Sequence, residues 1–427
     1  MNATEGYYDT FSFFEDCIIE VREKGPDGSR LKNFVPTIGT FHTHLPLRKA
    51  FGIYDAKYFV TKRRQVPPSF NEIRHILNIA QVLAINKDLK LISFDGDNTL
   101  YKDGGNFADN ENLSWSICSL MRKGIYCALI TAAGYGYDGK KYAIRLEGLF
   151  KKFIAEKLTA EEIARFFVFG GECNYLLRCE LSEDGNETIL QPIPDDVWQA
   201  DSIVGPKPSK FPPNQIKQIL DTAETSMRHT CEEMHLRAKI LRKERAVGMF
   251  PGGDEFTAIY PKGHGSKKLK REALDEVVLR VMDELRVANP PITIPFCVFN
   301  GGRDAWIDIG NKRVGVECLQ SFLGIPPSQC LHVGDQFLTT GNDIAARFVA
   351  PCVWIISPNE TEKMLEHILT HLDMETPKSR SGSMTTPPIS ATNSGINLDS
   401  LVDEQKEKFN LRKSSNNATF CVYTGNS

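Results

Sequence analysis

Two aspartates that directly follow a short apolar run are the residues best placed to do chemistry. The run is LISF at residues 91–94, and the chain continues Asp95-Gly96-Asp97. Such a run predicts a buried parallel strand, and open α/β sheets bind ligands beyond the carboxyl ends of their strands. Two carboxylates this close repel unless a cation or a proton separates their charges, and Mg²⁺ favours oxygen ligands and phosphates. The pair therefore predicts a Mg²⁺ and phosphate site, although an Asx-rich loop that only caps a helix would look similar.

Further polar residues stand at the ends of other predicted elements. Thr131 ends the apolar run IYCALIT, where its hydroxyl and the following amides could hold a phosphate. Lys312 opens the helix-like segment before RVGVECLQSFLG, where it could screen charge between Asp95 and phosphoryl oxygens. Asp335 follows the strand-like LHVG, and Asp343 lies further along the same loop. Each residue alone also fits an ordinary loop threonine, a solvated lysine or a helix-capping acid. The prediction of a phosphate site therefore depends on their order in the chain after the aspartate pair.

The elements around these residues predict an α/β fold with an insert. Strand and helix patterns alternate near 91–131 and again over 294–357, as in an open parallel sheet. In the second stretch DIAARFVA predicts a helix, and SPNE at 357–360 predicts a capping box that opens the last helix. The stretch between these two regions contains NYLLRCELSEDGNETILQPI, a hairpin pattern with its turn at Asp184-Gly185, and charged segments at 212–245 and 266–288 that are predicted to be helical. The predicted units are an N-terminal unit at 1–70, a core in two parts at 71–145 and 291–375, an inserted α+β unit at 146–290, and a tail at 376–427 whose composition predicts disorder.

Composition narrows the class of protein. The 427 residues are 41% hydrophobic and 25% charged, which is typical of a globular chain, and the formal net charge of −3 predicts no binding to nucleic acid or to membrane surfaces. We find no signal-peptide pattern and no apolar run long enough to span a membrane. The eleven cysteines are scattered and form no CxxC pair, which predicts buried, reduced thiols in a cytoplasmic protein.

These motifs, taken in their order along the chain, resemble those of the haloacid-dehalogenase-like phosphatases. The resemblance implies a Rossmannoid parallel-sheet core, with the insert between Thr131 and Lys312 as a C2-type cap that closes over the site. Asp95 would attack phosphorus and form an aspartyl-phosphate, while Asp97 would act as general acid and then as general base. The other implied roles are Mg²⁺ ligands at Asp95, Asp97 and Asp335, a supporting carboxylate at Asp343, and substrate contacts at Asp97, Thr131 and Lys312.

A narrower resemblance points to the substrate. The segments FDGDNTLYKDGG, LITAAGYG, RKERAVGMFP, GGRDAWIDIGNKRVGVECL and HVGDQFLTTGND are similar to those of the IMP-specific 5′-nucleotidases of fungi and malaria parasites. This implies hydrolysis of IMP to inosine and phosphate, with Asp103 and Asp304 near the nucleoside, where carboxylates can accept hydrogen bonds. It also implies a mainly helical regulatory N-terminal unit that binds ATP as an activator near Lys57 and His75 and joins subunits in a homotetramer.

Two other functions stay open on the sequence alone. One is a phosphotransferase or sugar phosphomutase of the same superfamily, which would release little free phosphate. The other is a nucleotide sensor that kept the fold and lost turnover. The intact set of motif residues argues against the sensor, and GGRDAWIDIGNK lacks the aromatic and Gly-Trp residues expected of the mutase.

Overall fold

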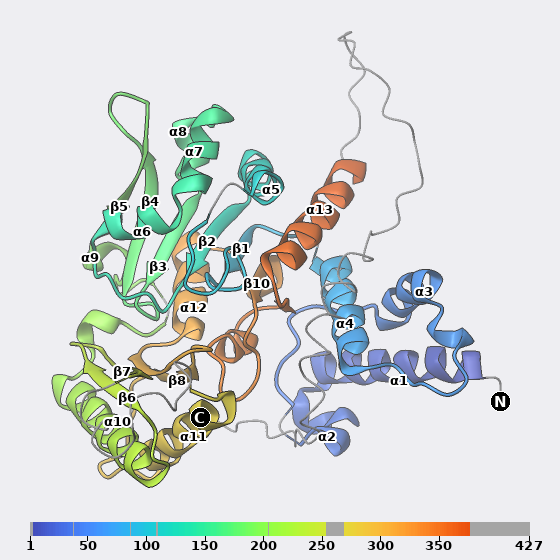
Figure 1. Ribbon diagram of the computed structural model, residues 1–427. Helices are drawn as coiled ribbons and strands as arrows, with labels where there is room; N and C mark the ends of the chain where they lie inside the picture. The colour runs from blue at the N-terminus through green and yellow to red at the C-terminus, as the bar shows by residue number, and fades with distance from the viewer. Residues whose placement is uncertain are drawn as a thin grey trace.

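A computed structural model describes residues 3–36, 38–85, 87–107, 110–203, 205–252 and 269–375. The predicted tail at 376–427 lies outside the described residues. The described chain forms a seven-stranded sheet, a four-stranded sheet and a helical N-terminal unit that lies beside them (Figure 1). Within this described part, none of the helices combines the length and apolar character needed to cross a membrane.

The large sheet has the strand order β11-β10-β1-β2-β3-β4-β5. Its first five strands in this order run parallel and the last two form an antiparallel hairpin. In the pairing register Phe94 of β1 stands beside Leu129 and Val333, so the carboxyl ends of three strands are level. The strands are β1 (Leu91–Phe94), β2 (Tyr126–Ile130), β3 (Phe166–Gly170), β4 (Tyr175–Leu181), β5 (Thr188–Pro192), β10 (Cys330–Gly334) and β11 (Cys352–Trp354).

Alternating side chains bury both faces of this sheet. Ile92 and Phe94 point to the face covered by helices α5 (Glu111–Arg122), α7 (Glu147–Ala155) and α13 (Pro358–Glu375). Leu91, Ala128 and Ile130 point to the opposite face, against α12 (Lys312–Leu323). Burial on both faces explains why these strands are continuous apolar runs rather than alternating patterns. Shorter helices over the sheet and its loops are α6 (Gly139–Arg145), α8 (Ala160–Ile163) and α9 (Asp195–Trp198).

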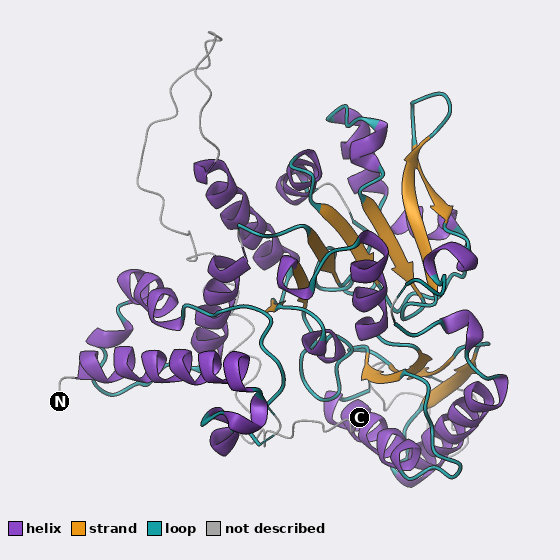
Figure 2. Cartoon of the chain, turned by 180° about the vertical axis from the view of Figure 1, so that it is seen from behind, coloured by secondary structure: helices purple, strands orange, loops and turns teal. Residues whose placement is uncertain are grey.

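The small sheet has the order β6-β7-β9-β8 and a separate core. Helices α10 (Pro213–Glu233) and α11 (Arg271–Arg286) pack on one of its faces, and Figure 2 shows them on the outer side of the molecule. The strands are β6 (Ala238–Arg242), β7 (Ala246–Pro251), β8 (Phe296–Asn300) and β9 (Ala305–Ile309). The α+β character predicted for the insert is therefore present, but the helix predicted over 212–245 ends at Glu233 and gives way to two strands.

The sheets place the insert later in the chain than the predicted limits of 146 and 290. The predicted hairpin forms, with Gly185 at φ 70°, but its strands β4 and β5 extend the large sheet. Strands β8 and β9, which we assigned to the core, pair within the small sheet. Local patterns identified these segments as strands, but a strand's partners are set by contacts far away in sequence, which is why the predicted limits were too early.

The N-terminal unit is helical, as predicted. It consists of α1 (Ala3–Lys24), α2 (Leu31–Phe34), α3 (Leu47–Tyr58) and α4 (Phe70–Ile85) around its own core. Helix α4 belongs to two cores, because Ile76 and Ile79 pack in the N-terminal unit while Val82 and Ile85 pack beneath the large sheet. Short 3₁₀ segments of three residues occur at Pro26–Gly28, Val60–Lys62, Pro208–Lys210 and Pro327–Gln329. A further 3₁₀ segment of five residues is Ile344–Phe348. The last of these replaces the α-helix expected at DIAARFVA.

A buried ion pair joins α4 to α13. Arg74 donates to both oxygens of Glu360, at 2.8 and 3.0 Å, and Glu360 also accepts from the backbone N–H of Ile356 at 3.0 Å. His75 Nε2 lies 3.4 Å from Oε1 of the same carboxylate. The capping box expected from SPNE is thus replaced, because Glu360 faces the N-terminal unit.

This pair predicts acid-labile stability. Burial raises the pKa of Glu360, but hydrogen bonds from His75 and Arg74 outweigh it and lower the pKa from 4.5 to about 2. A carboxyl with a lowered pKa stabilises the fold above its ordinary pKa, and this stabilisation is lost as the pH falls from 4.5 toward 2. We expect Glu360→Gln to lower the free energy of unfolding by about 3 kcal/mol at pH 7. The difference from wild type should shrink below pH 4, measured by denaturant unfolding; a difference independent of pH would contradict this.

Candidate active site

The predicted chemical residues lie together at one edge of the large sheet. Asp95 follows β1 and its backbone N–H donates to Val333 O at 2.8 Å, while Thr131 follows β2 and donates to Phe169 O at 2.9 Å. Both side chains are buried. Asp335 follows β10, which pairs directly with β1. Because these strands are parallel, their carboxyl ends deliver the side chains to the same place.

Lys312 is the cation at the centre of the site. It is the first residue of α12, whose start is capped by the Asn311 side chain, and it is completely buried. Its Nζ contacts Asp95 Oδ1 and lies 2.5 Å from Asp343 Oδ1. Burial alone would lower the pKa of Lys312, but the two carboxylates raise it well above its ordinary value. The lysine therefore stays charged in a place where an unpaired ammonium would be very costly.

Asp343 is fixed on several sides. His332 Nε2 lies 3.0 Å from its Oδ1, and the Gln336 backbone N–H donates to Oδ2 at 2.8 Å. Burial raises the pKa of Asp343, but Lys312 and His332 lower it by more, so this carboxyl is ionised. A Cβ at position 334 would lie 2.2 Å from the Asp343 carboxyl carbon, which explains the glycine in HVGD.

Three carboxylates form a candidate metal site. Oxygens of Asp95, Asp335 and Asp343 lie within 4.8 Å of one another. Asp335 Oδ1 is buried and, among the described residues, has no hydrogen-bond partner, while Oδ2 accepts from Asn98 at 3.3 Å. Burial and the charge of Asp343 raise the pKa of Asp335 to about 7. An orphaned buried oxygen in an all-carboxylate cluster fits a hard divalent cation such as Mg²⁺.

The Asp97 side chain, which we predicted as a metal ligand, is not in this cluster. Its Oδ1 accepts a hydrogen bond from the Gly104 backbone N–H at 2.8 Å. Burial raises the pKa of Asp97 despite that bond. Among the described residues, the Asp97 side chain therefore lies outside the candidate metal site.

The two predicted nucleoside contacts lie where the sheets meet. Asp103, in the loop after β1, pairs with Arg303 of the β8–β9 turn at 3.0 Å. Asp304 is in the same turn, and its pKa is raised first by burial and then by the charges of Asp103 and Asp97. The Asn300 backbone N–H also donates to Thr340 O at 2.8 Å, in the loop that carries Asp335. The structure therefore brings both residues to the junction of the core and the insert.

Three buried polar residues around the site were missed in the sequence. They are His332, Glu172 and Asn342. For His332 a signal existed, because alternation along LHVGD puts it on the face opposite Leu331 and Val333, toward α12. Its Nδ1 pairs with Ser93 Oγ at 2.9 Å. Glu172 follows two glycines in GGEC, and no residue pattern announces its pairing with Asn342.

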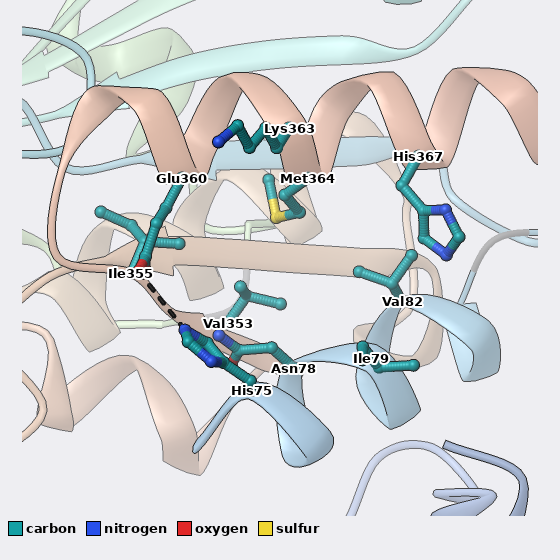
Figure 3. Close-up of a pocket in the computed structure, with 10 residues that line it drawn as sticks. All are labelled: His75, Asn78, Ile79, Val82, Val353, Ile355, Glu360, Lys363, Met364 and His367. Atoms are coloured by element: carbon teal, nitrogen blue, oxygen red, sulfur yellow. Dashed lines mark hydrogen bonds and ion pairs between the residues drawn. The ribbon is translucent and has the colours of Figure 1, made fainter. Parts of the chain in front are cut away.

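The predicted effector residues lie in the N-terminal unit and at its contact with the core. Lys57 Nζ is 5.5 Å from the Tyr58 ring centroid, Tyr58 packs on Tyr54 at 4.5 Å, and Tyr54 lies 6.2 Å from the His75 ring. His75 also lines a pocket between α4 and α13, where Figure 3 shows it facing Glu360 (Figure 3). The other lining residues are Asn78, Ile79, Val82, Val353, Ile355, Lys363, Met364 and His367.

The parallel sheet, with polar residues after β1, β2 and β10, and the separate small sheet define an α/β protein with an inserted α+β unit, as predicted. A family model described as IMP-specific 5′-nucleotidase matches residues 3–365. The chain belongs to this family.

Curated relatives and solved structures agree with this assignment. IMP-specific 5′-nucleotidase 1 of Plasmodium falciparum is 38% identical over 352 residues, covering 82% of this chain and 75% of the relative. The Schizosaccharomyces pombe protein of the same name is 40% identical, covering 83% and 82%. The structure of an N-terminally truncated, IMP-bound P. falciparum IMP-nucleotidase superposes with a TM-score of 0.74 at 36% identity, covering 84% of this chain and 90% of the other. An ATP-bound structure of that nucleotidase has a TM-score of 0.71 at 36% identity, covering 86% and 80%.

Proposed function

We propose that this chain hydrolyses IMP to inosine and phosphate through an aspartyl-phosphate on Asp95, in the presence of Mg²⁺. The observation that carries the proposal is the buried Lys312 between Asp95 and Asp343, beside the orphaned oxygen of Asp335. We infer the substrate from the family of IMP-specific 5′-nucleotidases to which the chain belongs. The residues present fit a bound Mg²⁺, which Asp95, Asp335 and Asp343 would hold and which would supply positive charge to the phosphoryl oxygens.

In the proposed reaction an Asp95 carboxylate oxygen forms a bond to phosphorus as the bond between phosphorus and the ribose O5′ breaks. The Asp97 carboxyl gives its proton to O5′, and inosine leaves. Asp97, now a carboxylate, takes a proton from a water molecule that attacks phosphorus. Phosphate is released and the Asp95 carboxylate is regenerated. Lys312 and the Thr131 hydroxyl and following amides would orient and neutralise the phosphoryl oxygens throughout.

Phosphate release from a panel of substrates tests this function. We expect purified protein with Mg²⁺ to release phosphate from IMP much faster than from GMP, AMP, a sugar phosphate or p-nitrophenyl phosphate. Release from the others but not from IMP would keep the mechanism and discard the substrate. A phosphomutase would convert a sugar phosphate with little free phosphate, and a sensor would bind nucleotide with no turnover, so either result would reject the proposal.

Asp97→Asn should separate proton transfer from nucleophilic attack. Asparagine cannot protonate O5′, so kcat for IMP should fall about 10²–10⁴-fold. The loss should be smaller with p-nitrophenyl phosphate, because p-nitrophenolate leaves without a proton. Steady-state kinetics on both substrates measure the two losses, and equal losses would assign Asp97 a role other than general acid.

We also propose that ATP activates the enzyme through the contact of the N-terminal unit with the core. Support comes from hydrogen bonds that lead from α4 to the candidate metal site. Arg74 and Asn78 both donate to Trp354 O, each at 2.6 Å, and Trp354 Nε1 donates to Asp335 O at 2.8 Å. A ligand that moves α4 relative to α13 would thus act on the backbone of Asp335.

The ratio of IMP hydrolysis with and without ATP tests this regulation. It should exceed one in wild type and fall toward one in His75→Ala and Lys57→Ala. Exposed Lys49→Ala, on the same helix as Lys57, serves as the matched control. Unchanged stimulation in both variants would place the effector elsewhere.

We also propose that the enzyme is a homotetramer located in the cytoplasm. Phe34 and Phe59 of the N-terminal unit are 60% and 61% exposed, which suits a subunit contact. The ten described cysteines are free thiols, which suits a reducing compartment. Light scattering during gel filtration should give four times the chain mass, whereas a monomer would reject the assembly.

A further inference from the structure

The loop after β3 has an unusual backbone. Gly171, Glu172 and Cys173 are consecutive and all left-handed, with φ values of 59°, 49° and 72°. Glycine adopts this region freely, but a residue with a Cβ is disfavoured there by roughly 1–2 kcal/mol. Such residues persist where surrounding contacts impose them, and they cluster at functional sites. The contacts of Glu172 show what holds the loop in this backbone conformation.

Glu172 touches three separate parts of the active site. Its backbone N–H donates to Thr131 O at 3.2 Å, at the end of β2. Its carbonyl packs so closely on Gly310 that a Cβ there would lie 2.2 Å away, just before the cap of the Lys312 helix. Its side-chain Oε1 accepts from Asn342 Nδ2 at 2.9 Å, in the loop that ends at Asp343. One residue thus contacts the segments that present the predicted phosphate-binding threonine, the lysine and the acidic cluster.

The burial of this carboxyl is hard to explain by stability. Glu172 is fully buried, and among the described residues its Oε2 has no hydrogen-bond partner. Burial raises its pKa to about 7, with the charge of Lys312 and the Asn342 hydrogen bond acting in the opposite direction. A buried carboxyl with an unsatisfied oxygen costs free energy that an apolar residue would not. A positional role would account for it.

We propose that Glu172 is a positioning residue for phosphoryl transfer, which holds the segments of Thr131, Lys312 and Asp343 in their mutual arrangement. It acts through the Asn342 amide and through the backbone at Thr131 and Gly310, without touching the reacting atoms. The proposal rests on the proposed hydrolysis of IMP.

A double-mutant cycle with Asn342 tests this role. We expect Glu172→Ala to lower kcat about 10–100-fold with little change in KM for IMP. Adding Asn342→Ala should cost little more, because both changes remove the same contact. Glu172→Gln should recover most of the loss, since its amide oxygen can still accept from Asn342. Gln320→Ala is the matched control: it removes a buried hydrogen bond, to Val349 O, at the far end of α12 and should lower the melting temperature without lowering kcat.

Three results would overturn the proposal. They are wild-type kcat in Glu172→Ala, fully multiplicative losses in the double variant, and a Glu172→Gln variant as impaired as Glu172→Ala. If wild type itself releases no phosphate from IMP, the proposed function is rejected. The positioning role of Glu172 is then tested by amide hydrogen exchange instead of by kcat. Faster amide exchange at 131–134 and 335–343 in Glu172→Ala, but not in Gln320→Ala, would still support it, and unchanged exchange in these segments would reject it.

Discussion

Asp95→Asn should abolish phosphate release from IMP, with kcat lowered by at least ~10⁴-fold. An amide oxygen is a poor nucleophile, and no other described carboxyl combines the position of Asp95 after β1 with contact to Lys312. The fold should not suffer. Burial and the charges of Asp343 and Asp335 raise the pKa of Asp95, so an uncharged side chain relieves a crowded cluster. Without Mg²⁺ the variant should melt at or above the wild-type temperature, by calorimetry.

The matched control is Asp88→Asn, at an exposed position shortly before β1. It should keep wild-type kcat and melting temperature. Phosphate release by Asp95→Asn within tenfold of wild type would remove Asp95 from the mechanism. Loss of activity with a lower melting temperature would instead point to a role in folding.

Lys312→Met should damage both stability and catalysis. Methionine has a similar length but no charge, so Asp95 and Asp343 would face each other in a buried site with no cation between them. Removing one partner of a buried ion pair typically costs 3–5 kcal/mol, and we expect a loss of about that size in the free energy of unfolding. We expect kcat to fall by about 10²–10³-fold as well, because the developing phosphoryl charge loses a fixed counter-charge. Denaturant unfolding without Mg²⁺ and steady-state kinetics with it measure the two effects.

Arg313→Met provides the control at the next residue of the same helix. Arg313 is half exposed and pairs with Glu317 at 3.8 Å, so its loss should change stability by less than about 0.5 kcal/mol. If Lys312→Met were as stable and active as Arg313→Met, the central ion pair would not have the role assigned to it.

The parts of the site that follow from local sequence were predictable. An apolar run ending in a polar residue identifies a strand and its carboxyl end, and this placed Asp95, Thr131 and Asp335 at one edge of the sheet. The start of α12 at Lys312 and its end at Gly324, which has φ 66°, likewise follow from local helix signals. Such features depend on a few neighbouring residues, so one sequence contains them.

Features set by distant contacts were not predictable. The hairpin of β4 and β5 joins the large sheet because β4 pairs with β3, and nothing within the hairpin announces this. The sequence predicts Glu360 as a helix-capping residue, but its carboxylate forms an ion pair with a buried arginine in α4. Glu172 contacts the loops that follow three different strands, and no local pattern in GGEC indicates those contacts. In each case the partner lies far along the chain, and the side chain alone fits a more ordinary role.

The central claim is that the phosphoryl group passes onto Asp95, and trapping the intermediate tests it most directly. Wild-type protein would be mixed with IMP and Mg²⁺, quenched in acid during turnover and treated with borohydride, which reduces an acyl phosphate to an alcohol. Peptide mass spectrometry should then find homoserine at position 95, only when IMP was present. Homoserine at another aspartate, or an unmodified residue 95 at every time point of a turnover that produces inosine, would contradict the account.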